Sequence, residues 1–367
     1  MIYLDSGATS LIKPASVWQA VAQAIRTCGN SGRGGHRAAM TAAETVYRCR
    51  ESAAELFGCT PEQVVFTANC THGLNIAIRT LVKPGSRVVI SGFEHNAVTR
   101  PLHALKAKTV VAGRLLFDPE DTLESFRRAL DQGVDVAVFT HVSNVFGYIL
   151  PVQAMSAMCR ERGVPFIIDA AQSAGTVPVS LETLGADFIA MPGHKGLLGP
   201  QGTGLLLCAR PPEPLMFGGT GSESIRQSMP DTLPERAEAG TLNVPGIAGL
   251  EAGLRYLKRV GVEEIGRREH RAARNCAKML RQLGFQVFSG PSQAGTVSFV
   301  TACDGEEAAY QLARRGIALR AGLHCAPLAH ESAGTLESGT LRVSFGIDAG
   351  DDQVEALRRE ILACGVR

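Results

Sequence analysis

Two apolar segments of this chain each lead into a side chain that could do chemistry. Residues 166–168 end in Asp169, and residues 188–191 are followed shortly afterwards by Lys195. Short apolar runs of this kind are typical of buried strands, so one strand would deliver a carboxylate and the next an amine. A cofactor with a pyridinium ring and an aldehyde needs both groups, the carboxylate for the ring nitrogen and the lysine for a Schiff base. Pyridoxal 5'-phosphate (PLP) is such a cofactor, and this pair of residues predicts it.

A phosphate site is predicted where segment 67–73 precedes a helical run. Backbone N–H groups at a helix N-terminus can surround a phosphate. We place the Thr71 hydroxyl in this phosphate site, with His194 as a further donor. The alternative is that Thr71 caps the helix without binding any ligand.

Three polar side chains at or past strand ends could contact the cofactor ring. His95 follows the predicted strand 87–91, and an imidazole there could stack on the pyridine and relay protons near neutral pH. A single histidine is more often structural, which is the alternative. Gln172 and Asn144 could reach the phenolate oxygen of the cofactor. Because ligands bind at the carboxyl ends of strands in such sheets, we expect these residues to converge with Asp169.

A cysteine and an arginine near the C-terminus complete the candidate site. Cys325 lies in segment 320–327, which contains Gly and Pro and shows little apolar periodicity, so an exposed loop is expected. A thiolate could be favoured there beside His324 and near Arg320, although most cysteines are inert. Arg342 interrupts an apolar run, and a buried guanidinium needs an anion, which a substrate carboxylate could supply.

The order of the predicted elements indicates an α/β protein with two domains. The 367 residues exceed the roughly 250–300 over which a single core usually grows. Residues 16–245 alternate short apolar strands with helices, which is typical of a mostly parallel sheet covered on both faces. Residues 246–367 predict a smaller α+β domain on which residues 1–15 pack. Segment 210–240, rich in Pro, Gly and Ser, predicts a long loop over the site.

Composition argues against several other classes of protein. A net charge of +2 gives no reason to expect a nucleic acid or an anionic membrane as partner. No apolar run reaches the roughly 20 residues of a membrane span. The ten cysteines include no CxxC pair and no Cys/His cluster at zinc spacing, so no metal site is predicted. With no secretory signal in view, a cytoplasmic location is expected.

Together these residues resemble the cysteine desulfurases, PLP enzymes of aminotransferase class V and fold type I. The resemblance implies a large domain with a mostly parallel seven-stranded sheet flanked by helices, plus a smaller C-terminal α+β domain. It covers nearly the whole chain and rests on segments 3–9, 94–95, 141–144, 169–172, 193–195, 238–241 and 320–327.

The resemblance also implies a role for each matching residue. Lys195 would form the Schiff base and Asp169 would face the ring nitrogen. His95 would stack on the ring and move protons, and Cys325 would attack the substrate sulfur and carry it as a persulfide. The remaining residues would bind the cofactor, namely Cys70, Thr71, Asn144, Gln172, His194 and, across a dimer interface, Thr241, or the substrate, namely Asn144, Arg320 and Arg342.

The activity expected from the resemblance is conversion of L-cysteine to L-alanine by a homodimer that passes sulfur to an acceptor protein. Three alternatives stay open: a selenocysteine lyase acting on L-selenocysteine, a class V aminotransferase or β-lyase without a loop thiol, and a non-catalytic scaffold. The short span from Cys325 to Arg342 resembles the compact-loop desulfurases, which include relatives acting on selenocysteine. Two positions depart from the family pattern, Pro192 where a serine commonly contacts the phosphate, and Gly7 where alanine is usual.

Overall fold

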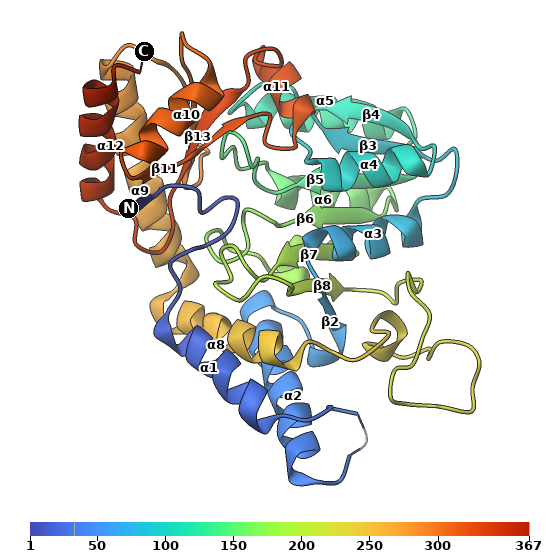
Figure 1. The fold of residues 1–367 in the computed structure, drawn as a ribbon. Coiled ribbons are helices and arrows are strands. Elements are labelled where there is room, and N and C mark those ends of the chain that lie inside the picture. The colour runs from blue at the N-terminus through green and yellow to red at the C-terminus, as the bar shows by residue number, and fades with distance from the viewer. Residues whose placement is uncertain (33, 367) are drawn as a thin grey trace.

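The computed structural model describes residues 1–32 and 34–366, whose strands form one large sheet, one smaller sheet and one short pair (Figure 1). In this part of the chain the large sheet has seven strands in the order β2-β8-β7-β6-β5-β3-β4. These strands are β2 (Val64–Thr67), β3 (Arg87–Ser91), β4 (Lys108–Ala112), β5 (Val136–Thr140), β6 (Phe166–Asp169), β7 (Phe188–Pro192) and β8 (Gly204–Cys208).

The large sheet is mostly parallel, as predicted. Strands β4, β3, β5, β6 and β7 pair in parallel, and β8 runs antiparallel to both β7 and β2. Strands β5, β6, β7 and β8 are buried along their whole length. Such continuous apolar runs are expected of strands covered on both faces, and they explain why the two runs that begin at Phe166 and Phe188 are recognisable in the sequence.

Helices cover both faces of this sheet. They are α1 (Ala15–Thr27), α2 (Arg37–Phe57), α3 (Cys70–Leu81), α4 (Asn96–Ala104), α5 (Pro119–Asp131), α6 (Val152–Glu161), α7 (Leu181–Leu184) and α8 (Val244–Val260), with short 3-10 helices at Pro61–Gln63 and Glu235–Ala237.

Neighbouring residues of one strand point to opposite faces of the sheet. Val89 and Phe139 therefore join an apolar cluster with α2, α5, α6 and α8. Val88 and Val138 join a second cluster with α3 and α4. Each face of the sheet is thus covered by helices that connect the strands. This arrangement produces the alternation of strands and helices from which the fold class was predicted.

The smaller unit lies beside the large sheet and carries both ends of the described chain (Figure 1). Its antiparallel sheet has the order β12-β13-β10-β9, and β1 pairs in parallel with β11. The strands are β1 (Ile2–Tyr3), β9 (Gln286–Phe288), β10 (Thr296–Val300), β11 (Ile317–Ala318), β12 (Arg320–Gly322) and β13 (Thr340–Ser344); the helices are α9 (Val262–Gln282), α10 (Gly305–Arg314), α11 (Pro327–Ala333) and α12 (Asp351–Cys364).

Helix α9 begins in the apolar cluster of the larger unit and continues into that of the smaller unit. Leu250 and Leu257 of α8 and Ile265 at the start of α9 pack in the large-sheet cluster, whereas Ala272 belongs to the cluster of the smaller sheet. Helix α8 also packs along α1 and α2. The predicted boundary between residues 245 and 246 thus falls within the first turn of α8, a helix that packs on the larger unit. The division into domains stays a prediction.

Local signals set the helix ends that matter for the site. The side chain of Asn69 accepts a hydrogen bond from the His72 N–H at 2.9 Å, which starts α3 at Cys70. Helix α2 ends at Gly58, whose φ of +59° is the left-handed conformation common at helix C-termini. The start of α3 therefore lies at the end of β2, beside the strand ends that carry the predicted site.

One glycine near Lys195 provides a test of the packing. Gly175 has φ +93°, and a Cβ there would lie 2.2 Å from the carbonyl oxygen of Gly196. Gly284 has φ +90° with nothing within 4 Å, so it is a matched control. We expect Gly175→Ala to lower the free energy of unfolding by more than about 2 kcal/mol, and Gly284→Ala by about 1 kcal/mol. Urea unfolding measures both; equal losses would contradict the close packing at Gly175.

Candidate active site

The predicted site residues gather at the carboxyl ends of four neighbouring strands. His95 follows β3, Asn144 follows β5, Asp169 ends β6 and Lys195 follows β7. Carboxyl ends of parallel strands meet at one edge of a sheet, and there a single pocket forms against the start of α3. The predicted residues that line it are Cys70, Thr71, His95, Asn144, Asp169, Gln172, His194 and Lys195.

Asp169 is buried and held by one of its two oxygens. Its Oδ1 accepts a hydrogen bond from the Ala171 N–H at 2.9 Å and from the Cys70 thiol at 3.4 Å. Burial and the neighbouring Asp169 raise the pKa of Cys70 well above its ordinary value, so the thiol stays protonated and donates. Within the described chain no donor reaches Oδ2, which leaves that oxygen for a group in the pocket.

Lys195 is partly exposed because it faces the pocket. Removal from bulk water and the nearby charge of Arg342 lower the pKa of the Lys195 amine, while Asp169 acts in the opposite direction. A lowered pKa increases the share of uncharged amine at neutral pH, and the uncharged amine is the nucleophilic form. The amine is thus suited to bond to an aldehyde and to take up a proton.

The N-terminus of α3 offers donors for an anion. Asn69 binds the N–H groups of His72 and Gly73, through its side chain and its carbonyl. In the part of the chain described here, the N–H groups of Cys70 and Thr71 have no hydrogen-bond acceptor. The helix dipole adds to their attraction for a phosphate.

His194 approaches the pocket from β7 and is held by the N-terminal segment. Its Nδ1 lies 3.1 Å from the hydroxyl of Thr9, and its carbonyl accepts the Ser10 N–H at 2.9 Å. Burial and the charges of Lys195 and Lys13 lower the pKa of His194 to about 4. The imidazole is therefore neutral at pH 7 and could offer a phosphate a hydrogen bond but no charge. Pro192 lines the pocket without a donor of its own.

His95 caps a helix and also lines the pocket. Its Nδ1 accepts the Ala97 N–H at 3.0 Å and so caps α4. This bond assigns the proton of the neutral ring to Nε2. Burial lowers the pKa of His95, although the Asp169 charge opposes the shift. The alternative that this histidine is structural is correct for Nδ1. The face of the ring stays available for stacking, and the Nε2–H stays available to donate a hydrogen bond.

Gln172 is in the pocket, but one of its amide hydrogens is already bonded. Its Nε2 donates to the carbonyl of Gly7 at 2.9 Å. The remaining N–H can still reach a ligand, so the predicted contact with the phenolate oxygen stays a prediction.

Thr241 lies apart from the other predicted residues. It lines a separate hollow with Arg50 and Tyr47, and the loop before it is held by the buried ion pair between Arg50 and Glu238 at 2.5 Å. Most of the loop predicted at 210–240 is irregular, but within the described residues it does not line the pocket of its own chain, so the prediction that it covers that site is wrong for a single chain.

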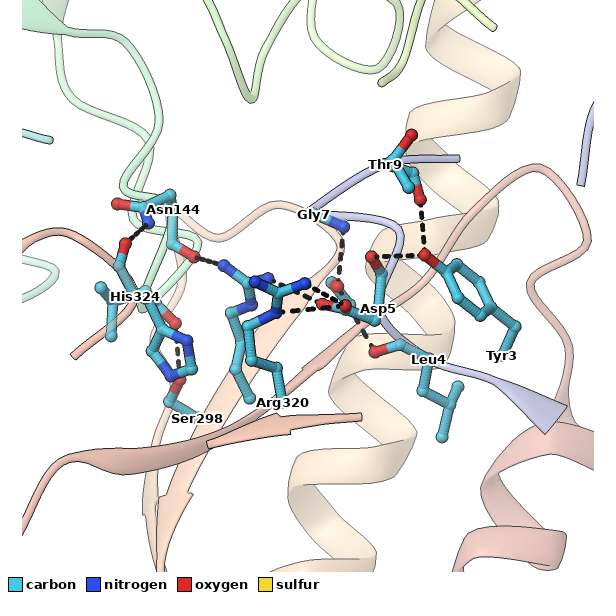
Figure 2. A network of polar contacts seen from close by, with 12 residues as sticks. Tyr3, Leu4, Asp5, Gly7, Thr9, Asn144, Ser298, Arg320 and His324 are labelled. Atoms are coloured by element: carbon cyan, nitrogen blue, oxygen red, sulfur yellow. Dashed lines mark hydrogen bonds and ion pairs between the residues drawn. The ribbon is translucent and has the colours of Figure 1, made fainter. Parts of the chain in front are cut away.

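Arg342 is 3% exposed and already has an anionic partner in the protein. Its Nη2 lies 2.9 Å from Asp5 Oδ1, and its Nη1 donates to the carbonyl of Asn144 at 3.0 Å. Arg320 binds the other Asp5 oxygen at 2.9 Å (Figure 2). Among the described residues, Nε of Arg342 has no hydrogen-bond partner. Asp5 was missed as a partner of Arg342, although the motif at 3–9 contains it.

Cys325 is exposed on the segment between β12 and α11, as predicted, but His324 does not activate it in the way expected. The His324 Nε2 bonds to the carbonyl of Thr340 at 3.0 Å. Burial and the charge of Arg342 lower the pKa of His324 to about 3. An imidazole with that pKa is uncharged at neutral pH, so it cannot supply the positive charge that was predicted to favour a thiolate.

Glu94 is a second residue whose role the sequence did not reveal. It is fully buried, and its Oε1 accepts N–H groups from Ser91 and Thr140, which end β3 and β5. The carboxyl therefore ties together the two strands from which His95 and Asn144 emerge. The only signal in the sequence was its place beside His95.

Comparison with known proteins identifies the family of this chain. Residues 2–357 match the family Aminotransferase class-V. The chain belongs to this family. It is 32% identical over 373 residues to a protein of Pyrococcus abyssi named "Probable cysteine desulfurase", covering 97% of this chain and 92% of that protein. A protein of the same name from Methanothermobacter thermautotrophicus is 30% identical over 371 residues, with the same coverage.

A solved structure is also similar to the whole chain. The apo structure of cysteine desulfurase from Thermococcus onnurineus NA1 superposes with a TM-score of 0.90 at 31% identity, covering 99% of this chain and 95% of that chain. The resemblance to class V and to fold type I is confirmed, and members of this family use PLP.

The residues present fit that cofactor. Asp169 Oδ2 can accept from a pyridinium N–H, the Lys195 amine can bond to an aldehyde, and the two open N–H groups of α3 can bind a phosphate. Across residues 1–32 and 34–366, no group of three or more His, Cys, Asp or Glu could hold a metal ion. Over the same residues, no helix has the length and apolar character needed to cross a membrane.

The buried Glu94 carboxyl leads to a prediction about pH. Burial raises the pKa of Glu94 from 4.5 to about 8, so between these values the folded protein holds a proton that the unfolded chain has lost. This contribution to stability is complete below pH 4.5 and is lost as pH rises towards 8. Glutamine stays neutral throughout. We therefore expect the free energy of unfolding of wild type, relative to Glu94→Gln, to fall by up to about 1.4 kcal/mol per pH unit between pH 5 and 8. Urea unfolding at four pH values tests this, and a constant difference would contradict it.

Proposed function

We propose that this protein is a PLP-dependent cysteine desulfurase that converts L-cysteine to L-alanine and holds the sulfur as a persulfide on Cys325. The observation that carries the proposal is the placement of an exposed thiol on a segment bonded to the rim of the pocket that contains Lys195 and Asp169. The names of the relatives at about 30% identity over nearly the whole chain support the same substrate.

The pocket residues hold the cofactor and act on the substrate. When bound, PLP would withdraw electrons from the substrate Cα and so weaken the bond between Cβ and sulfur. Asp169 would keep the ring nitrogen protonated, and the open end of α3 with His194 would hold the phosphate. Lys195, whose pKa is lowered by burial, would take the proton from the substrate Cα.

The arginine pair would bind the substrate carboxylate. Arg342 and Arg320 share the single carboxylate of Asp5, so the cluster keeps one unbalanced positive charge. A bidentate contact with a guanidinium fixes both the position and the orientation of a carboxylate. Such a contact would orient the substrate so that its sulfur points towards Cys325.

The atoms and electrons of the sulfur transfer balance with the Cys325 thiol as the one co-reactant of L-cysteine. The Cys325 thiolate attacks the substrate sulfur, a sulfur–sulfur bond forms and the bond from Cβ to sulfur breaks. The electron pair passes to Cβ, which takes a proton and becomes the methyl group of alanine. His95, which lines the same pocket, would relay that proton. L-Cysteine and the enzyme thiol thus give L-alanine and the enzyme persulfide, without a further oxidant or reductant.

The partners of this reaction are also proposed. A homodimer would bring Thr241 of one chain to the phosphate of its neighbour. The large apolar side chains exposed on α1 and α2, Trp18, Ile25, Met40 and Tyr47, are a surface suited to such an interface. The short, exposed Cys325 segment suits an acceptor protein that docks close to the pocket.

Replacing the thiol tests the proposal directly. We expect Cys325→Ala to bind PLP normally but to lose at least about 100-fold in alanine formation from L-cysteine, because no nucleophile remains to take the sulfur. Purified protein is incubated with L-cysteine, and alanine and protein-bound persulfide are measured together. Cys303→Ala, at another exposed cysteine, is the control and should retain both products.

Other outcomes of that assay would refute the proposal. Normal alanine formation by Cys325→Ala would exclude Cys325 as the sulfur carrier. Pyruvate in place of alanine would indicate a β-lyase. Turnover of L-selenocysteine but not of L-cysteine by the wild type would indicate a selenocysteine lyase.

The assignment of Lys195 has its own test. We expect Lys195→Ala to lose the visible absorbance band of protein-bound PLP and all turnover, because no other amine lines the pocket among the described residues. Absorbance spectra of the purified variant after incubation with PLP are compared with those of wild type. An unchanged band that resists dialysis would show that a different group bonds to the cofactor.

A further inference from the structure

The segment that carries Cys325 contains an unusual turn. His324 has φ +49° and Cys325 has φ +58°, the left-handed conformation that side chains other than glycine rarely adopt. Among the described non-glycine residues, these are the only two neighbours in the chain that both have positive φ. Such a conformation persists only when the surrounding structure holds it, so the contacts of the turn reveal what positions the thiol.

Both carbonyl groups of the turn accept hydrogen bonds from the large-sheet unit. The Cys325 carbonyl accepts the Asn96 N–H at 2.7 Å, and the His324 carbonyl accepts from Asn144 Nδ2 at 2.7 Å. Asn96 begins α4 after β3, and Asn144 follows β5. The turn lies between β12 and β13 in the sequence, but its backbone is fastened to the strand ends that form the pocket.

Asn144 makes a second contact of importance for the site. While its side chain holds the turn, its carbonyl accepts from Arg342 Nη1 at 3.0 Å. Figure 2 shows both bonds in one continuous network that runs from His324 through Asn144 to the arginines and Asp5. Asn144 is 9% exposed; its bond to Arg342 is buried, and its bond to His324 is partly buried. A hydrogen bond is stronger away from competing water.

We propose that Asn144 is the positioning residue for the thiol, because it fixes the Cys325 turn relative to Arg342. Its amide group sets where the thiol stands, and its carbonyl sets where the carboxylate-binding guanidinium stands. The distance between the substrate carboxylate and the attacking sulfur is thereby fixed by one residue. This inference rests on the proposed role of Cys325, and it differs from the sequence-based expectation that the Asn144 side chain contacts the cofactor or the substrate.

Two variants of Asn144 test the inference. Asn144→Ala removes the donor, and Asn144→Asp keeps the size but places an acceptor against the His324 carbonyl; both leave the backbone carbonyl that binds Arg342. We expect kcat for alanine formation to fall by about tenfold or more because the thiol leaves its attack geometry. KM for L-cysteine should stay within about twofold, and the absorbance of bound PLP should not change. Asn275→Ala, which removes an exposed amide bond to Asp351 on the smaller unit, is the control and should behave as wild type.

Amide hydrogen exchange measures how firmly the Cys325 turn is held, and it does not depend on catalysis. In both Asn144 variants the backbone amides of residues 322–330 should exchange faster than in wild type, while those around Cys303 should not change. In the wild type the Asn96 amide should exchange slowly. It begins a helix, where N–H groups lack a partner within the helix, so its protection depends on the bond to the Cys325 carbonyl.

Several results would overturn the inference. A raised KM with normal kcat would mean that Asn144 binds substrate and does not position the thiol. Unchanged exchange at 322–330 would show that the turn stands without Asn144, and rapid exchange of the Asn96 amide in wild type would refute the fastening even if neither variant folded. Activity retained by Cys325→Ala would refute the proposed sulfur carrier, whereas the exchange measurements would still decide whether Asn144 holds the turn.

Discussion

One carboxylate, that of Asp5, joins the two arginines that we propose as the substrate-binding pair, Arg342 and Arg320. It accepts from Arg342 through one oxygen and from Arg320 through the other. Arg342 is almost fully buried, and a buried guanidinium without a counter-ion would be costly. Because Asp5 follows β1, which pairs with β11 of the smaller unit, this contact also fixes the path of the N-terminal segment. The next residues then bond to Gln172 and His194 of the larger unit.

The N-terminal segment therefore acts as a connector between the two units. Gly7 receives the Gln172 amide, and Thr9 and Ser10 hold the carbonyl of His194. Without the N-terminal segment, the side chains of Gln172 and His194 would lack these contacts and would rotate more freely. Positioning by a separate segment reduces that freedom before any ligand binds, which lowers the entropy lost on binding.

Burial lowers the pKa of several basic side chains in and around the pocket. The pKa values of Lys195, His95, His194 and His324 are all lowered, in each case mainly by burial. Asp169 keeps two donors on one oxygen. General acid–base catalysis is most efficient when the pKa of the transferring group lies near the working pH. Burial shifts the pKa of Lys195 in that direction. His324 is too strongly shifted to take part, and its role is structural.

The amino-acid sequence by itself determined the residues able to do chemistry and the strands that carry them. Apolar runs ending in Asp169 and in Lys195 identified a parallel sheet and a cofactor site, because periodicity and residue type are local properties of the chain. Only the tertiary structure decided how these side chains pair. Asp5 and Arg342 are 337 residues apart, and Asn144 and His324 are 180 apart. Asp5 meets Arg342 within the smaller unit, whereas Asn144 meets His324 where the two units pack together. Both pairs depend on the tertiary fold, which no local pattern encodes. The same fold lowers the pKa of His324 by burial and leaves Thr241 outside the pocket of its own chain.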